Sequence, residues 1–109
     1  MKIPKAIKIG GHLAKVSAIK TKGHWKGFGS YDPKTNDIVI LQEHDDVKIA
    51  PSLQRTTMLH EVLHAVFDIS GLANKYNVIA EEEFIRTLEP ILFQVMRDNP
   101  KLVQFIMAK

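Results

Sequence analysis

The sequence contains no cysteine, which excludes disulfide bonds and thiolate metal ligands. A metal ion held by side chains would therefore use histidine and carboxylate ligands. No apolar run approaches the ~20 residues of a membrane-spanning helix, and residues 1–13 lack the continuous apolar segment of a signal peptide. We expect a cytoplasmic protein that does not enter the membrane. Its length predicts one domain, residues 1–109, with a single modest core.

Acidic residues are missing from the first part of the chain, where every charged residue before Asp32 is a lysine. The net charge of the whole chain is only +3. The solvated face of a sheet is the ordinary origin of such a distribution, and we favour it. The alternative is a surface for nucleic acid or an acidic partner, with Trp25 and Phe28 available for base stacking. The lysines concerned are Lys2, Lys5, Lys8, Lys15, Lys20, Lys22 and Lys26.

The sequence His60-Glu61-Val62-Leu63-His64 has the H-E-x-x-H pattern of zinc-dependent peptidases. On an α-helix, residues four apart share one face about 6 Å apart along the axis, so both imidazoles can reach one metal ion. Glu61 lies beside the open coordination position, where its carboxylate can take a proton from a water molecule. The alternative is a buried helix whose two histidines are only hydrogen-bonded. We favour the metal site because burying these three polar groups without partners is costly.

The rest of the chain predicts an α+β fold: a short antiparallel β-meander of about three strands, packed on two helices. Residues 13–20 favour a strand, and residues 29–41 form the clearest hairpin, with turn-forming residues at 32–37. Residues 42–48 predict a polar connection, and we favour a solvated turn over a metal site for its cluster of Glu43, His44, Asp45 and Asp46.

Pro51 fits the first position of the helix that carries the motif, and Gly71 fits its left-handed cap. A second helix is expected from about Ala80, with a kink at Pro90. A short last helix is expected over residues 101–108.

A catalytic zinc ion usually takes three protein ligands and leaves one position open. The expected third ligand is a glutamate, because Glu81, Glu82 and Glu83 open the second helix. Glu81 and Glu82 precede the apolar Ile85 by four and three positions, whereas Glu83 lies about 160° away from it. We prefer Glu82 and keep Glu81 as the alternative. The remaining glutamates would compensate the helix dipole.

Together these features resemble the ImmA/IrrE-type metallopeptidases, and in particular their short forms encoded by phages and mobile elements. The resemblance implies a gluzincin-like zinc site formed by His60, His64 and Glu82, with Glu61 as general base. It also implies cleavage of a regulatory protein such as a phage repressor. Mn²⁺ or another divalent ion accepts the same ligands. The resemblance spans the last three quarters of the chain and is carried by Gly29, Tyr31-Asp32, Ile38-Val39-Ile40, residues 57–66, Glu82-Glu83-Phe84-Ile85 and Arg97-Asp98-Asn99-Pro100.

The expected function is therefore hydrolysis of peptide bonds in a protein substrate. That substrate would lie extended along an exposed strand, for which we expect residues 38–41. Tyr76, His44 and Tyr31 are the candidate second donors to the oxyanion, and none is assigned. The alternative function is a non-catalytic binding module, stabilised by its metal, that acts in phage regulation or assembly.

Overall fold

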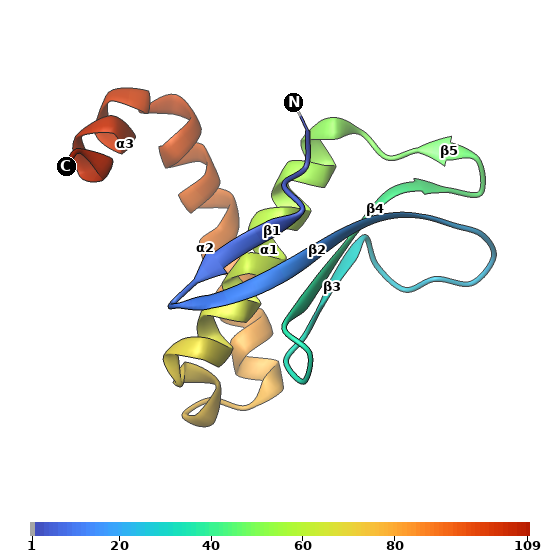
Figure 1. Ribbon diagram of the computed structural model, residues 1–109, viewed down its shortest axis with the longest axis horizontal. Helices are drawn as coiled ribbons and strands as arrows, with labels where there is room; N and C mark the ends of the chain where they lie inside the picture. The colour runs from blue at the N-terminus through green and yellow to red at the C-terminus, as the bar shows by residue number, and fades with distance from the viewer. Residues whose placement is uncertain (1) are drawn as a thin grey trace.

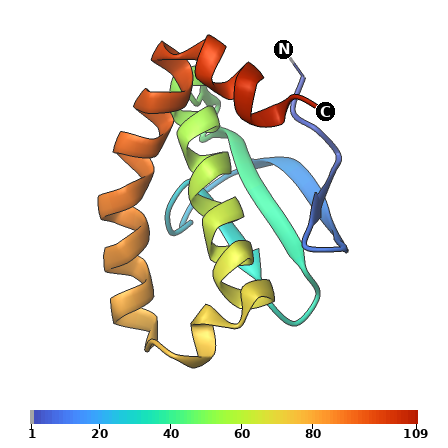
Figure 2. The same ribbon diagram turned by 90° about the vertical axis from the view of Figure 1, so that its left-hand side faces the viewer.

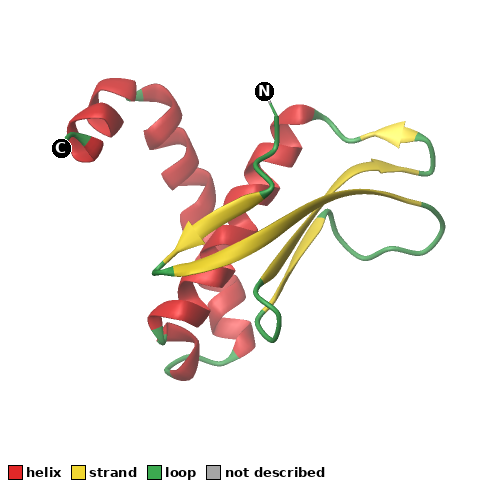
Figure 3. Cartoon of the chain, in the orientation of Figure 1, coloured by secondary structure: helices red, strands yellow, loops and turns green. Residues whose placement is uncertain are grey.

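The computed structural model describes residues 2–109 (Figures 1 and 3). Within these residues the fold is α+β, with one mixed five-stranded sheet, three α-helices and a short 3₁₀ helix. The strands are β1 (Ala6–Ile9), β2 (His12–Thr21), β3 (Gly29–Asp32), β4 (Asp37–His44) and β5 (Val47–Lys48). The helices are α1 (Pro51–Ser70), η1 (Leu72–Asn74), α2 (Val78–Asp98) and α3 (Pro100–Met107).

The predicted antiparallel meander is wrong, because the sheet is mixed. Its order is β1-β2-β4-β3, with β5 paired to β4, and β2 runs parallel to β4. The chain crosses from β2 to β4 through residues 22–36, a connection that contains β3 and is long enough for a parallel pair. Burial explains this order: Ile38, Ile40 and Leu41 of β4 are 0–2% exposed, so β4 takes an inner position and β3 remains at the edge.

The strand over residues 13–20 and the hairpin over residues 29–41 are confirmed as β2 and as the β3–β4 pair. The turn expected within residues 42–48 is present, but the connection is shorter than predicted. β4 continues to His44, and β5 pairs with it across a turn at Asp45 and Asp46. Both turn residues have positive φ, 49° and 67°. Aspartate tolerates this conformation better than most residues, and such tight turns favour it.

The helix α1 lies between the sheet and α2 (Figure 2). Ala65, Met58 and Val62 of α1 pack on the core that the sheet provides around Ile38 and Ile40. The opposite side of α1 packs against α2. The helix α3 follows α2 in the chain and contacts it. This layering places one face of α1 directly opposite the first turns of α2.

The bounds of α1 agree with the prediction, since the helix begins at Pro51 and ends before Gly71, whose φ is 87°. α2 begins at Val78, two residues earlier than expected, because the Asn77 side chain accepts a hydrogen bond of 2.8 Å from the Ala80 N–H. Pro90 lies inside α2 and does not end it. The short last helix is confirmed as α3.

No helix within residues 2–109 combines the length with the apolar character that crossing a membrane requires.

Candidate metal centre

The two motif histidines lie one turn apart on the face of α1 that meets α2. The ring centroids of His60 and His64 are 5.0 Å apart, and the ring planes are inclined by 69°. Their side chains are 23% and 19% exposed, so both rings are largely enclosed while keeping some access to solvent. The spacing therefore brings the two imidazoles together as the sequence predicts.

Glu82 lies opposite both rings. Its Oε1 atom is 3.1 Å from Nε2 of His60, and its Oε2 atom is 2.9 Å from Nε2 of His64. Glu81 has a different position, because its Oε2 atom lies 2.6 Å from Nδ1 of His64, on the other side of that ring. The Glu82 carboxylate thus faces the Nε2 atoms of both histidines, and the Glu81 carboxylate contacts only the Nδ1 atom of His64.

Glu61 is buried beside the histidines, with only 6% of its surface exposed. One ligand atom from each of His60, Glu61 and His64 lies within 4.8 Å of the others, a group that does not include Glu82. Burial raises the pKa of Glu61 to about 7, with His64 opposing this shift and Glu82 adding to it. The carboxyl group therefore changes its charge near neutral pH.

The neighbouring groups titrate in the directions that metal binding needs. Burial lowers the pKa of His60, although the charge of Glu82 acts in the opposite direction. Burial would raise the pKa of Glu82, but the hydrogen bond from Arg86 and the two imidazoles lower it instead. The Nε atom of Arg86 lies 3.0 Å from Oε1 of Glu82. Neutral imidazole and ionised carboxylate are the forms that coordinate a divalent ion.

The donor set and its spacing fit such an ion. With zinc–ligand bonds of 2.0–2.1 Å, neighbouring donor atoms in a tetrahedral site lie about 3.3 Å apart. The two contacts between Glu82 and the Nε2 atoms, at 3.1 and 2.9 Å, are only slightly shorter, and each uses a different carboxylate oxygen. Side-chain shifts that bring both Nε2 atoms toward one of these oxygens would let His60, His64 and Glu82 share one ion.

A cavity of about 700 Å³ opens onto these side chains. Its volume is in the range of small-molecule and peptide side-chain sites. Loop 22–28 and β3 line one side of it, and α1 and α2 line the other. The lining residues that matter below are Lys26, Gly27, Phe28, Glu61, Glu82 and Arg86.

The three candidate oxyanion donors, none of which was assigned, do not line this cavity. The Tyr31 hydroxyl lies 2.8 Å from Oδ2 of Asp68, and burial together with Asp68 raises the pKa of Tyr31. Tyr76 packs on the ring of Phe84, and His44 contacts the Thr21 hydroxyl. Each of the three has a structural role in the fold.

Sequence reasoning missed two basic residues that do line the cavity, Arg86 and Lys26. Arg86 could have been found from its position four residues after Glu82, a spacing at which helical side chains meet. Lys26 lies in a loop, where the spacing of residues along the sequence does not predict which way a side chain points.

The edge strand beside the site is β3. The expected strand, residues 38–41, is paired on both sides within β4 and offers no free edge there. β3 ends the sheet, and its Gly29 lies against α1: a Cβ atom built there would be 3.4 Å from Cγ of Glu61. An extended peptide that pairs with β3 would thus pass the motif.

Fold and site together define an α+β domain with a candidate two-histidine, one-glutamate metal centre between α1 and α2. Comparisons of the chain with protein-family models, with curated proteins and with solved structures returned no match. The resemblance to the ImmA/IrrE-type metallopeptidases stays a prediction from the sequence motifs.

Proposed function

We propose that this protein is a metal-dependent peptidase that hydrolyses peptide bonds in a protein substrate, with a phage or mobile-element regulator as the expected substrate. Zinc is the expected ion, and Mn²⁺ or another divalent ion would use the same ligands. The observation that carries the proposal is the convergence of His60 Nε2 and His64 Nε2 on the Glu82 carboxylate, beside the buried Glu61.

His60, His64 and Glu82 would hold the ion. When bound, a divalent ion acts as a Lewis acid on the scissile carbonyl and on water. Glu61 takes a proton from the attacking water and passes it to the leaving amine, because its buried carboxyl group lies beside the candidate ligands. Glu81 keeps the His64 ring oriented through its Nδ1 atom.

The cavity supports an enzyme over a metal-stabilised binding module. Structural zinc sites are closed by four protein ligands, whereas catalytic sites keep one position open. The candidate ligands here are two imidazoles and a carboxylate that border a space of about 700 Å³. The edge of β3 borders the same space and provides backbone groups that can pair with an extended peptide.

The metal and the chemistry can be tested in one set of variants. We would measure the metal content of purified wild type, His60→Ala and Glu61→Gln by elemental analysis. We would then follow cleavage of fluorescently labelled casein and of a mixed peptide library. Wild type and Glu61→Gln should both contain one equivalent of metal, but only wild type should cleave. His60→Ala should lose the metal.

Glu83→Gln is the matched control, because Glu83 is an exposed neighbour of the candidate ligand. It should retain both metal and cleavage. Unchanged cleavage by Glu61→Gln would remove Glu61 from the role of base. Metal binding without cleavage of any substrate in the library would favour the binding module.

A further inference from the structure

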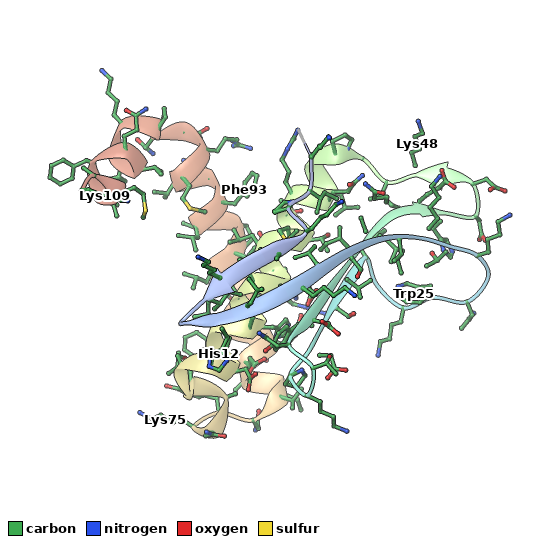
Figure 4. All side chains as sticks on the ribbon, in the orientation of Figure 1. His12, Trp25, Lys48, Lys75, Phe93 and Lys109 are labelled. Atoms are coloured by element: carbon green, nitrogen blue, oxygen red, sulfur yellow. The ribbon has the colours of Figure 1, made fainter. Side chains whose placement is uncertain are left out.

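A second cavity, of about 480 Å³, lies between loop 22–28 and the β4–β5 hairpin. Aromatic and aliphatic side chains provide most of its lining, with His44 and Asp45 completing it. Trp25 and Phe28 are 44% and 47% exposed, so both rings can contact another molecule. Trp25 lies at the opposite end of the molecule from Lys109 (Figure 4). The lining of this cavity includes Trp25, Gly27, Phe28, Leu41, Val47 and Ile49.

Hydrogen bonds hold the two walls of this cavity together. The Gly23 N–H donates to Oδ1 of Asp45 at 2.8 Å, and the Asp45 N–H donates to the Thr21 carbonyl at 2.9 Å. At the other end of the loop, the Leu41 N–H donates to the Phe28 carbonyl at 2.9 Å. Loop 22–28 is therefore tied to β4 and its hairpin near both of its ends. The cavity is preformed, which lowers the entropy that a ligand must overcome.

The apolar cavity adjoins the cavity at the candidate metal centre. Gly27 and Phe28 line both spaces. Phe28 directly precedes Gly29, the residue of β3 that lies against Glu61. Because a strand advances about 3.3 Å per residue, a peptide paired with β3 would reach the apolar cavity within about one to three residues of the bond at Glu61.

We propose that this cavity is a specificity pocket for an apolar side chain of the peptide substrate, large aliphatic or aromatic, flanking the cleaved bond. The inference rests on the proposed peptidase function for the position of that bond. Burial of such a side chain against Trp25, Leu41 and Val47 would provide the preference, because polar partners are few in the lining.

The lining favours a peptide over a nucleic acid. Leu41, Val47 and Ile49 are aliphatic and offer no face for stacking a base. The hairpin turn also places Asp45 and Asp46 beside the loop, and Lys22 lies 3.6 Å from Asp46. Carboxylates at this position repel phosphate and neutralise the nearby lysine.

The test uses Trp25, the one tryptophan of the chain, as a native reporter. The zinc-loaded Glu61→Gln protein would be titrated with acetyl-Ala-Ala-Phe-Ala-Ala-amide, and separately with peptides that carry Asp or Ala in place of Phe. The Phe peptide should shift Trp25 emission to the blue in a saturable manner. Its affinity should exceed that of the other two by about tenfold or more.

Val47→Lys and Leu13→Lys form a matched pair of variants. Both residues are exposed strand aliphatics, at 67% and 65%, but Leu13 lies in β2 outside this cavity. Val47→Lys should weaken binding of the Phe peptide about tenfold, and Leu13→Lys should leave it unchanged. Equal affinity for the Phe and Asp peptides would overturn the pocket. So would a Val47→Lys protein that binds like its parent, or displacement of the Phe peptide by oligothymidylate.

Cleavage by the zinc-loaded wild type separates the two proposals. Phe-peptide binding without cleavage of any peptide would support the pocket and contradict the peptidase. Cleavage with no preference for apolar flanking residues, and no shift of Trp25 emission, would support the peptidase and overturn the pocket.

Discussion

At the residue scale, the two glutamates that sequence spacing could not separate have different partners. Glu82 faces the Nε2 atoms of His60 and His64, while Glu81 contacts Nδ1 of His64 at 2.6 Å. Imidazoles that bind metal through one nitrogen usually donate the other N–H to a carboxylate or carbonyl, which fixes the ring. The arrangement is the one expected if Glu82 is a ligand and Glu81 a supporting residue.

The first prediction concerns this division. Glu82→Gln should reduce zinc affinity more than Glu81→Gln, because the first change removes a charged donor and the second only loosens a ring. For Glu81→Gln we expect a loss of about 10- to 100-fold. Competition with a chromophoric chelator measures both, and Glu83→Gln should bind like wild type. A larger loss for Glu81→Gln than for Glu82→Gln would exchange the two roles.

The second prediction concerns Glu61 in the protein stripped of metal by a chelator. Its pKa is about 7 when folded, against 4.5 when exposed, so its ionisation opposes folding. The stability associated with the neutral carboxyl is present below about pH 4.5 and is lost as the pH rises through 7. Glu61→Gln stays neutral, so its advantage over wild type in free energy of unfolding should grow by about 2.5 kcal/mol from pH 5 to pH 8. Urea unfolding at both pH values measures it, and a difference that does not change with pH would contradict it.

At the element scale, the site depends on how closely β3 approaches α1. A Cβ atom at Gly29 would lie 2.6 Å from Cγ2 of Thr57 and 2.8 Å from the Val39 carbonyl oxygen. Both distances are shorter than atoms tolerate, and the second obstacle is backbone. Glycine is therefore needed here to let an edge strand lie against the helix that carries Glu61.

The third prediction follows from this contact. Gly29→Ala should destabilise the protein by about 1–3 kcal/mol, because β3 must move away from α1 to make room. Peptide cleavage should fall with it, since the edge of β3 and the base at Glu61 would separate. Lys34→Ala, in the exposed turn after β3 and outside this cavity, is the control and should change neither quantity. Thermal unfolding and cleavage assays measure the two effects, and a stable, fully active Gly29→Ala protein would contradict the proposed role of β3.

Local signals predicted the helices well, because their ends are set by residues within one turn. Pro51 and Gly71 mark the ends of α1 through fixed backbone preferences. The sheet order could not be predicted in this way. The order depends on which strand buries the most apolar surface against residues that are distant in sequence. The β4–β5 hairpin depends on a positive φ at Asp45, and an aspartate in the sequence does not by itself indicate that conformation.

The part of the candidate site that lies on α1 alone could be predicted from the sequence. The four-residue spacing of His60 and His64 places both on one face of α1, whatever surrounds that helix. The choice between Glu81 and Glu82 depends on how α2 docks against α1, which no spacing within a single element specifies. The same holds for Lys26, because its loop approaches the site only after the sheet has formed.

At the scale of the whole molecule, the candidate centre joins two layers. α2 packs against α1 and α3, and within residues 2–109 its contacts with the sheet are few or absent. The residue of α2 that is fully buried is Ile85, at 0% exposure, one turn after Glu82. An ion shared by His60, His64 and Glu82 would therefore fasten the N-terminal part of α2 to the rest of the fold.

The last prediction tests this coupling by hydrogen exchange followed by mass spectrometry, with and without zinc. An ion that binds only the folded state at 100 times its dissociation constant adds about 2.7 kcal/mol to the free energy of unfolding. The melting temperature should therefore rise on the order of 10 °C. Exchange should slow most in residues 78–90, because those amides depend on the docking of α2, and less in β2 and β4, whose amides already lie within the sheet.

Glu82→Gln should abolish most of this local protection, since it removes the α2 ligand, while Glu83→Gln should preserve it. Protection that rises equally in the sheet and in α2 would mean that the ion stabilises only the global fold. No zinc-dependent change in α2 would show that the centre does not join the two helices, and the assignment of Glu82 as a ligand would fail with it.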